Sequence, residues 1–428
     1  MLMRTLVSQT IFLSGTHFLV RVVGFLLRIW LSRELGAQAM GLVELAQSAQ
    51  MLLITPVVSG LPAAVSRMCA KAQPERQVRV LRCALALALL VSLPLAVLAF
   101  ALRVPLSLWL GDIRTLPALL CYLPCIPVLG VSCALNGYYY GTGRPVPPAL
   151  SELLEQVVRL VLCVRLVSLL RGWPDMLRAA IPSLASLLGE TVSLVLMLLI
   201  AFRALVGPSG EGSRRLILRE LLSLALPLTG MRLVTALMRT VQAALIPARL
   251  QIAGLSSAQA LRCLGMYSGM TMPVLMIPSF ITCSLCMVAA PELTRRQASG
   301  QPHRRLILRI LGATLVVGLA AMAGVFAFAP LLAHRVYRQA ELLALLRRCC
   351  PLVPVMAMSQ VTGGLMNGLG LQSRSLRIAV AANFLSVVLM YALVALPGVQ
   401  LWGAVIALAA AQAFTLLFSL RALLGAAR

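Results

Sequence analysis

Residues 21–28 read Arg21-Val-Val-Gly-Phe-Leu-Leu-Arg28, and residues 232–239 read Arg232-Leu-Val-Thr-Ala-Leu-Met-Arg239. In each stretch, two arginines lie seven residues apart inside a run of apolar residues. Seven residues are almost two turns of a helix, so the two arginines of a pair share one helix face. The pattern recurs after 211 residues in a chain of 428. It therefore indicates a duplicated unit built of apolar helices.

The composition places these helices in a membrane. Hydrophobic residues make up 60% of the chain and charged residues only 11%, with a mean hydropathy of +0.95. Soluble globular proteins carry roughly 25% charged residues, because their surface must be largely polar. The composition excludes a soluble enzyme, a disordered chain and a secreted disulfide scaffold. Apolar runs of about 20 residues and more favour an all-α polytopic membrane protein over a β-barrel.

The apolar runs predict about twelve transmembrane helices in two parallel six-helix bundles around a central cavity. The predicted helices are residues 8–31, 41–66, 80–102, 115–138, 148–170, 177–202, 219–247, 263–290, 307–331, 343–368, 376–396 and 400–423. The first is expected to be retained, not cleaved as a signal peptide. The predicted domains are residues 1–206, a polar cytoplasmic linker at 207–218, and residues 219–428. Each half has an even number of helices, so the halves run parallel, and a substrate site is expected between them.

Further matches between the halves follow in the same order. Pro62-Ala-Ala-Val-Ser-Arg67 precedes a basic loop, as Val288-Ala-Ala-Pro-Glu292 does. Asn136-Gly137 and Asn367-Gly368 are predicted to end the fourth and tenth helices, at an offset of 231 residues. The residues from Asn136 to Gly143 are predicted to form a tight cytoplasmic turn. Together these matches support the duplication.

The basic residues orient the helices. The net charge is +25, and Lys71 is the only lysine among 37 basic residues. With the N-terminus inside, 20 basic residues fall in inner segments and 11 in outer segments. This asymmetry predicts a multi-pass protein of the bacterial cytoplasmic membrane with both termini in the cytoplasm. Most of the positive charge is assigned to anionic membrane lipids, and nucleic acid is not an expected partner.

The remaining six basic residues lie inside predicted spans: Arg21, Arg28, Arg159, Arg165, Arg232 and Arg239. A charge facing lipid at mid-depth costs several kcal/mol, so these side chains are expected to line a hydrated cavity or to be paired. The two duplicated pairs form an arginine ladder, which we define as Arg21, Arg28, Arg232 and Arg239. Snorkelling to the interface or pairing with backbone carbonyls is the alternative explanation for the ladder.

Other polar residues within the spans are further candidates. Glu155 and Arg159 are four residues apart in the favourable order, so they either neutralise each other or contact a substrate or coupling ion. Glu44 and Gln47 in the second predicted helix are further polar residues within a span, as is Glu190 in the sixth. Asn383 is a lone polar group that either joins helices or binds a ligand.

The sequence lacks a catalytic constellation, since it has no Ser/His/Asp set, no nucleotide-binding motif and no acidic metal cluster. Cys283 and Cys286 form a CxxC inside a predicted span, where small apolar filling is expected ahead of a metal or redox role. The three histidines are scattered. The chain is therefore predicted not to be an enzyme, and no cofactor or metal is expected. A membrane-embedded glycosyltransferase is disfavoured because the metal-binding acids are missing.

Several segments together resemble one family. They are residues 21–36 with the following Met40-Gly41, Gly60-Leu-Pro-Ala-Ala-Val-Ser-Arg67, residues 136–159, Leu250-Gln-Ile-Ala-Gly254 and Met272-Pro-Val-Leu-Met-Ile-Pro278. The combination resembles the stage V sporulation protein B family of polysaccharide-type flippases. This family belongs to the multidrug/oligosaccharidyl-lipid/polysaccharide exporter superfamily, with its MATE-like fold, and the lipid II flippase MurJ is a relative. Where the family often has an acidic residue in the seventh helix, this chain has Gln242.

The resemblance implies a function. It implies two six-helix bundles whose central cavity opens alternately to each side of the membrane. It also implies transport of an undecaprenyl-pyrophosphate-linked saccharide, a peptidoglycan precursor in the sporulation setting. Arginine forks suit a pyrophosphate headgroup. The candidate substrate-binding residues are Arg21, Arg28, Arg232, Arg239, Glu155, Arg159, Glu44, Gln47 and Asn383.

Two other functions stay open. A cation-coupled drug or small-molecule antiporter of the same superfamily would need acidic residues in its cavity, whereas here six arginines face four glutamates within the spans. A non-transporting partner in cell-wall assembly would bind cell-wall synthases, but would leave the arginine ladder without a role. The expected partners of the flippase are the lipid-linked glycan and membrane lipids, with cell-wall synthases considered as protein partners.

Overall fold

The structure is a computed structural model that describes residues 2–206, 213–278, 281–282, 286, 292–296, 299 and 304–426. All regular elements formed by these residues are helices. Their bounds are α1 Leu2–Val58, α2 Leu61–Lys71, α3 Pro74–Ala101, α4 Arg103–Trp109, η1 Ile113–Thr115, α5 Leu116–Tyr122, α6 Cys125–Gly141, α7 Val146–Leu169, α8 Asp175–Arg178, α9 Ile181–Val206, α10 Arg214–Ile252, α11 Ser257–Leu264, η2 Gly265–Thr271, α12 Met272–Leu275, α14 Arg304–Leu331, η3 Leu332–Val336, α15 Leu342–Cys349, α16 Leu352–Gly368, α17 Gln372–Leu393 and α18 Leu401–Ala426.

The helices confirm an all-α polytopic membrane protein. By length and composition, seven of the described helices could cross a membrane, or nine if each of two bent pairs is one span. Helix α7 is not among them, because four charged side chains interrupt its 24 residues. A helix of about 20 residues spans the apolar core of a bilayer, so the 57 residues of α1 are long enough for two crossings. The count of twelve spans stays a prediction.

The chain divides into two compact units. Unit 1 consists of Met1–Leu35 and Leu42–Thr240, and unit 2 of Gly36–Gly41 and Val241–Arg428. The division falls inside α10, whereas the sequence predicts a domain boundary at residues 207–218. Of that predicted linker, residues 207–212 lie outside the described residues, and the residues from Arg214 onward are already helical. The predicted boundary of the repeat remains a prediction.

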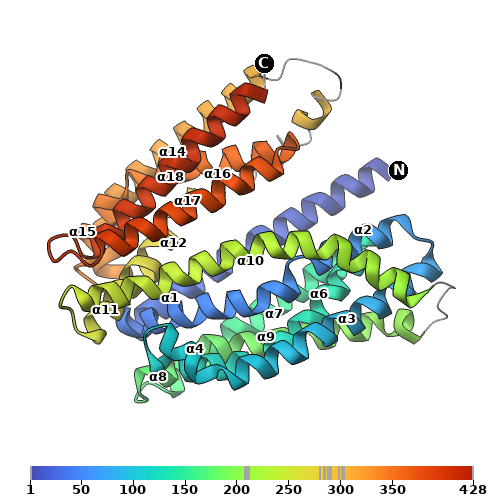
Figure 1. Cartoon of the computed structure of the whole chain (residues 1–428), viewed down its shortest axis with the longest axis horizontal. Coiled ribbons are helices and arrows are strands. Elements are labelled where there is room, and N and C mark those ends of the chain that lie inside the picture. The colour runs from blue at the N-terminus through green and yellow to red at the C-terminus, as the bar shows by residue number, and fades with distance from the viewer. Residues whose placement is uncertain are drawn as a thin grey trace. The chain divides into compact units, whose positions relative to one another are not determined.

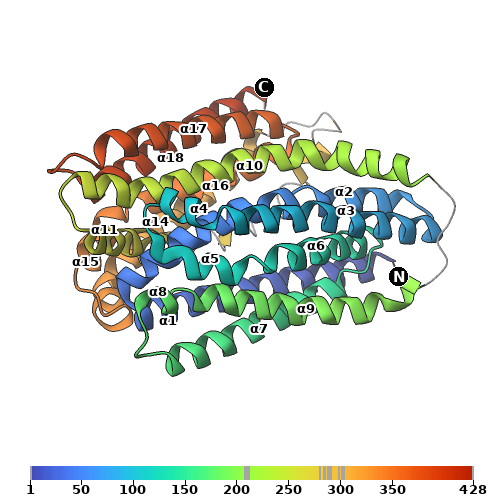
Figure 2. The same cartoon turned by 60° about the horizontal axis from the view of Figure 1, so that its bottom comes forward.

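In unit 1, α7 packs along α9, and α6 packs against α2, α3 and α9 (Figure 2). The core of this unit holds fully buried apolar residues from α2, α3, α6, α9 and α10. Glycines set the distance between α2 and α6. A Cβ atom at Gly137 would lie 2.7 Å from the carbonyl oxygen of Pro62, and one at Gly141 would lie 2.6 Å from that of Ser66. The two helices therefore touch along their backbones.

This packing corrects the interpretation of the segment from Asn136 to Gly143. Residues Asn136 and Gly137 do not end the helix, because α6 continues to Gly141. The turn comes later, at Gly143, whose φ of 71° lies in the left-handed region that glycine adopts without steric cost. The glycine at 137 is thus required for helix contact and not for a helix cap.

In unit 2, α14, α16, α17 and α18 run side by side (Figure 1). Their core includes Ile307 of α14, Leu365 of α16 and Leu423 of α18, each fully buried. The short segment of α1 in this unit packs against α11. A Cβ atom at Gly41 would lie 2.1 Å from the carbonyl oxygen of Leu261, so only glycine fits there.

The first two predicted helices are not separated by a loop but form one helix, α1, with a break. The sequence predicts a loop between residues 31 and 41, but α1 continues through this region with one break, at Gly36. The φ of 80° and ψ of 170° at Gly36 redirect the chain within a single residue. Only glycine reaches this conformation without steric cost, so no loop is needed.

The fourth and tenth predicted helices are both bent. Helices α5 and α6 meet at 43°, and α15 and α16 meet at 53°. The second helix of each pair follows a proline, Pro124 or Pro351, and each is 17 residues long. The bend and the helix end thus recur after 227 residues, against the 231 predicted from the Asn-Gly matches. The difference of four residues is one helical turn, because Asn136 lies one turn before the end of its helix.

The eighth predicted helix, residues 263–290, is described only in part. The structure has α11, the π-helix η2 and α12 up to Leu275, so the regular helix predicted here is interrupted at Gly265–Thr271. Of the CxxC, Cys283 lies outside the described residues. Cys286 is described, and its sulfur would lie 2.7 Å from a Cβ atom at Gly364. It therefore packs against α16 as a small apolar filler would.

Candidate functional site

Two polar helix faces meet within unit 1, one on α1 and one on α7. The Nδ1 atom of His17 lies 3.0 Å from the Oε2 atom of Glu152. Two turns further along α1 and one turn further along α7, a Cβ atom at Gly24 would lie 4.0 Å from the Oε1 atom of Gln156. Residues 17, 21, 24 and 28 share one helix face. Arg21 is therefore on the side of α1 that faces α7.

Arg28, at the C-terminal end of this face, is neutralised by a residue that follows the break at Gly36. The guanidinium of Arg28 donates a hydrogen bond to the carboxylate of Glu44. The two residues are 16 positions apart, yet both lie on α1, because the break at Gly36 directs the second segment back toward the first. The Glu44 side chain is only 14% exposed, so this carboxylate needs a cationic partner. The pair shows why an acid occurs at position 44 of an apolar helix.

A second ion pair lies within α7, facing α9. Glu155 is buried, and its carboxylate forms an ion pair with the guanidinium of Arg159. Helix α9 approaches closely here, since a Cβ atom at Gly189 would lie 3.0 Å from the carbonyl oxygen of Glu155. The next residue, Glu190, is half-buried and lies within electrostatic range of Arg159. The Nε atom of Arg159 is buried without a hydrogen-bond partner in the described part of the chain.

The arginine ladder divides into one paired and three unpaired members. Arg28 is bound by Glu44, as described above. The side chains of Arg21, Arg232 and Arg239 are exposed and form no hydrogen bond or ion pair with any described residue. On α10 the arginines are surrounded by exposed apolar side chains, among them Val234. All four ladder residues belong to unit 1.

The remaining candidates are in different surroundings. Gln47 is exposed and contacts neither Glu44 nor Arg28 through a hydrogen bond. In unit 2, the Nε2 atom of Gln242 donates to the backbone and side-chain oxygens of Asn383, at 3.3 and 3.4 Å. The amide of Asn383 also donates to the carbonyl oxygen of Ala379, at 2.8 Å. Asn383 thus links α17 to α10.

Sequence reasoning did not propose His17, Gln156 or Gln50 for the site. The three histidines are scattered along the sequence, but His17 precedes Arg21, Gly24 and Arg28 by four, seven and eleven residues. This spacing, applied to the whole helix, would have placed it in the polar face. Gln50 is buried and donates to the Oγ atom of Ser183 at 2.7 Å and to the carbonyl oxygen of Ala118 at 3.1 Å. It joins α1 to α5 and α9, which no local pattern indicates.

The charged side chains of the site are mostly arginines. Among the described residues, no group of three or more His, Cys, Asp or Glu side chains is placed to hold a metal ion. What the arrangement offers is a series of guanidinium groups in an apolar helical frame, of which Arg28 and Arg159 have carboxylate partners. Guanidinium groups without such partners can bind an anion in a bidentate manner.

The fold recurs in solved membrane transporters. An inward-facing multidrug resistance MATE family transporter of the MOP superfamily matches with a TM-score of 0.75 at 16% identity, over 96% of this chain and 97% of that chain. The lipid II flippase MurJ in its inward closed conformation also matches with a TM-score of 0.75, at 12% identity, over 96% of this chain and 87% of that chain. At such low identity these similarities establish the fold alone.

Sequence comparison identifies the family. Stage V sporulation protein B of Bacillus subtilis (strain 168) is 25% identical over 419 residues, covering 95% of this chain and 81% of that protein. The family described as polysaccharide biosynthesis protein matches residues 6–297, which is more than half of the chain. The resemblance inferred from the sequence motifs is confirmed: the chain is a multi-pass membrane protein that belongs to the polysaccharide biosynthesis protein family and has the fold of MOP-superfamily transporters.

Proposed function

We propose that this protein is a flippase that moves an undecaprenyl-pyrophosphate-linked saccharide across the cytoplasmic membrane by alternating access. The family and the fold support a flippase-type transporter and not an enzyme. The names of two relatives, a stage V sporulation protein and a lipid II flippase, make a peptidoglycan precursor for the spore cortex the first cargo to test.

One observation carries the proposal: Arg21, Arg232 and Arg239 have no carboxylate partner among the described residues, although Arg21 and Arg28 belong to the same helix face. An unneutralised guanidinium in an apolar helix is costly unless it reaches water or binds an anion. A pyrophosphate group offers several oxygens to such guanidinium forks. We assign headgroup binding to these three arginines.

The other candidates take supporting roles in this proposal. The Arg28–Glu44 pair fixes the two segments of α1 relative to each other and thereby positions Arg21. The Glu155–Arg159 pair, with Glu190 nearby, places charged groups between α7 and α9. Gln47 is exposed and can donate to a saccharide hydroxyl. Asn383 is a helix-linking residue, and we do not assign it a cargo contact.

The energy source is proposed to be a gradient, since the sequence has no nucleotide-binding motif. An empty cationic site moving in an inward-negative membrane potential would be drawn toward the cytoplasmic side. The proposed orientation, with both termini in the cytoplasm, rests on the 20 to 11 distribution of basic residues. Flipping rates that do not change when a potential is imposed on proteoliposomes would contradict voltage-driven resetting.

The test of the function is a reconstituted flipping assay. Purified protein in liposomes is given fluorescent lipid II, and the translocated fraction is scored by quenching of the outer leaflet. We expect wild-type protein to flip the lipid. We expect Arg21→Ala with Arg232→Ala to lower the rate by about a hundredfold, because each lost charge-assisted contact is worth about tenfold or more.

A matched control separates the ladder from general positive charge. Arg144→Ala with Arg215→Ala also removes two arginines, but both are exposed outside the predicted spans. This variant is expected to flip within about twofold of the wild type. Equal losses in both variants would refute a specific headgroup site. Absence of flipping by the wild type with lipid II and with other pyrophosphate-linked glycans would favour the antiporter or the assembly partner.

A further inference from the structure

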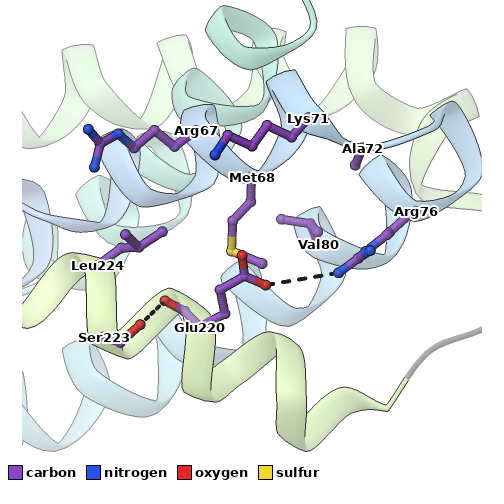
Figure 3. A pocket seen from close by; sticks show the side chains of 9 residues that line it. All are labelled: Arg67, Met68, Lys71, Ala72, Arg76, Val80, Glu220, Ser223 and Leu224. Atoms are coloured by element: carbon purple, nitrogen blue, oxygen red, sulfur yellow. Dashed lines mark hydrogen bonds and ion pairs between the residues drawn. The ribbon is translucent and has the colours of Figure 1, made fainter.

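Unit 1 contains a basic pocket at one end of its helices, away from the polar face of α1. The pocket has a volume of about 620 Å³ and lies between the end of α2, the start of α3 and the first turns of α10. Ligand pockets commonly have volumes of about 300–1,000 Å³. The charged residues that line it are Arg67, Lys71, Arg76 and Glu220 (Figure 3). We call it the α2–α10 pocket.

The charges in the α2–α10 pocket do not balance. Arg67 and Lys71 lie one turn apart on α2 and have no acidic partner among the described residues. Arg76 has only a long contact, with its Nη2 atom 3.9 Å from the Oε2 atom of Glu220, and both side chains are more than half exposed. Exposed pairs of this kind contribute little. Three cations and one carboxylate leave an excess of two positive charges in a concave site.

The pocket is built on fixed backbone. The Nε2 atom of Gln77 donates to the carbonyl oxygens of Cys69 and Ala72, at 3.0 and 3.1 Å, and so holds the turn between α2 and α3. On the other wall, a Cβ atom at Gly60 would lie 2.2 Å from the carbonyl oxygen of Ala225, so α10 packs directly on the start of α2. The cations are thus presented by elements whose spacing does not depend on a ligand.

The pocket also has an apolar side. Met68 and Val80 are buried beneath the cations and belong to the core of unit 1. On α10, Leu224 lines the pocket, and Leu228, one turn further along the same face, is 39% exposed. A ligand in this site would therefore have an anionic group among the cations and an apolar chain along α10. A soluble anion would make no use of the apolar part.

We propose that the α2–α10 pocket binds the phosphate headgroup of an anionic membrane phospholipid, with its acyl chain against α10. Arg67 and Lys71 bind the phosphate oxygens, and Arg76 binds them in competition with Glu220. This site is separate from the arginine ladder and does not depend on which cargo the protein moves.

The experiment measures lipid binding by native mass spectrometry of the full-length, detergent-purified protein. The probes are phosphatidylglycerol, phosphatidylcholine and sn-glycerol 1-phosphate. We expect phosphatidylglycerol to bind at least about tenfold more tightly than phosphatidylcholine, whose choline is repelled by the pocket. Arg67→Gln with Lys71→Gln should weaken phosphatidylglycerol binding about tenfold or more. Arg144→Gln with Arg215→Gln, a matched loss of two charges outside the pocket, should change it by less than about threefold.

A third variant keeps the test decisive if the double variant does not fold. Glu220→Gln removes the carboxylate that competes for Arg76 and should strengthen phosphatidylglycerol binding severalfold, a gain that unfolding cannot produce. Equal losses in the two double variants, or no gain in Glu220→Gln, would overturn the proposal in favour of a solvated basic surface. Binding of sn-glycerol 1-phosphate as tight as that of phosphatidylglycerol would overturn the lipid assignment in favour of a soluble phosphate.

Discussion

The helices α7 and α9 of unit 1 correspond in chain order to α17 and α18 of unit 2. Each pair follows a bent span that ends in a helix of 17 residues, and α9 and α18 are both 26 residues long. Their charges differ. Helix α7 carries Glu155 and Arg159, whereas α17 has Ala381 and Leu385 at the same distances from its first residue. Likewise, α9 carries Glu190, whereas α18 contains no acidic residue.

This difference separates what the fold requires from what function requires. The corresponding helices in unit 2 reach similar lengths and follow the same order with apolar residues at these positions. Buried ion pairs are weak stabilisers, and apolar replacements of similar volume are often as stable. The charges of α7 and α9 are therefore not needed to build the frame. They are more simply explained as part of the polar site of unit 1.

The largest expected effect comes from making α7 resemble α17. Glu155→Ala alone should destabilise the protein by about 3 kcal/mol or more, because it leaves Arg159 without its partner in a poorly hydrated site. Glu155→Ala with Arg159→Leu should recover most of that stability, to within about 1 kcal/mol of wild type, while flipping is lost. Thermal unfolding of the detergent-purified protein and the flipping assay measure the two effects separately.

The variant Glu155→Ala with Arg159→Leu tests whether the charges of α7 serve the fold or transport. If it is no more stable than Glu155→Ala alone, the charges of α7 serve the frame of unit 1 and the argument from unit 2 is wrong. If it is stable and flips normally, the pair has no part in transport.

An intermediate effect is expected from the backbone contacts of α6. Gly137→Ala would place a methyl group 2.7 Å from the carbonyl oxygen of Pro62 and should cost about 1–3 kcal/mol. Gly363→Ala, in the counterpart helix α16, meets nothing within 4 Å and should be neutral or stabilise by up to about 1 kcal/mol. Melting temperatures of the two variants test this, and equal shifts would show that α2 and α6 can separate without cost.

The smallest effect is expected from the link between α10 and α17. Asn383→Leu removes the long hydrogen bonds with Gln242 and should cost less than about 1 kcal/mol, in line with interhelical hydrogen bonds in membrane proteins. Flipping should stay within about twofold of wild type. A loss of tenfold or more at unchanged melting temperature would return Asn383 to the substrate-binding residues.

Much of the helical frame could be predicted from the sequence, because a span is recognised by a local sum of hydropathy. The prediction was less accurate where single residues redirect the chain. Gly36 replaces the loop predicted before residue 41, and Pro124 bends the helix predicted as 115–138. The Asn-Gly match placed the fourth helix end one turn early, since Gly137 serves contact with α2. Sequence alone does not distinguish a glycine that ends a helix from one that packs against a neighbour.

The sequence by itself determined that this is an all-helical membrane protein of a polysaccharide biosynthesis family, with arginines repeated inside its spans. Composition and motif spacing are properties of the chain and need no coordinates. Only the tertiary structure decided which charged and polar side chains meet. Glu44 meets Arg28 because the chain turns at Gly36, and His17 meets Glu152 because α1 lies along α7. The partner of a charge depends on distance in space, which a linear pattern does not contain.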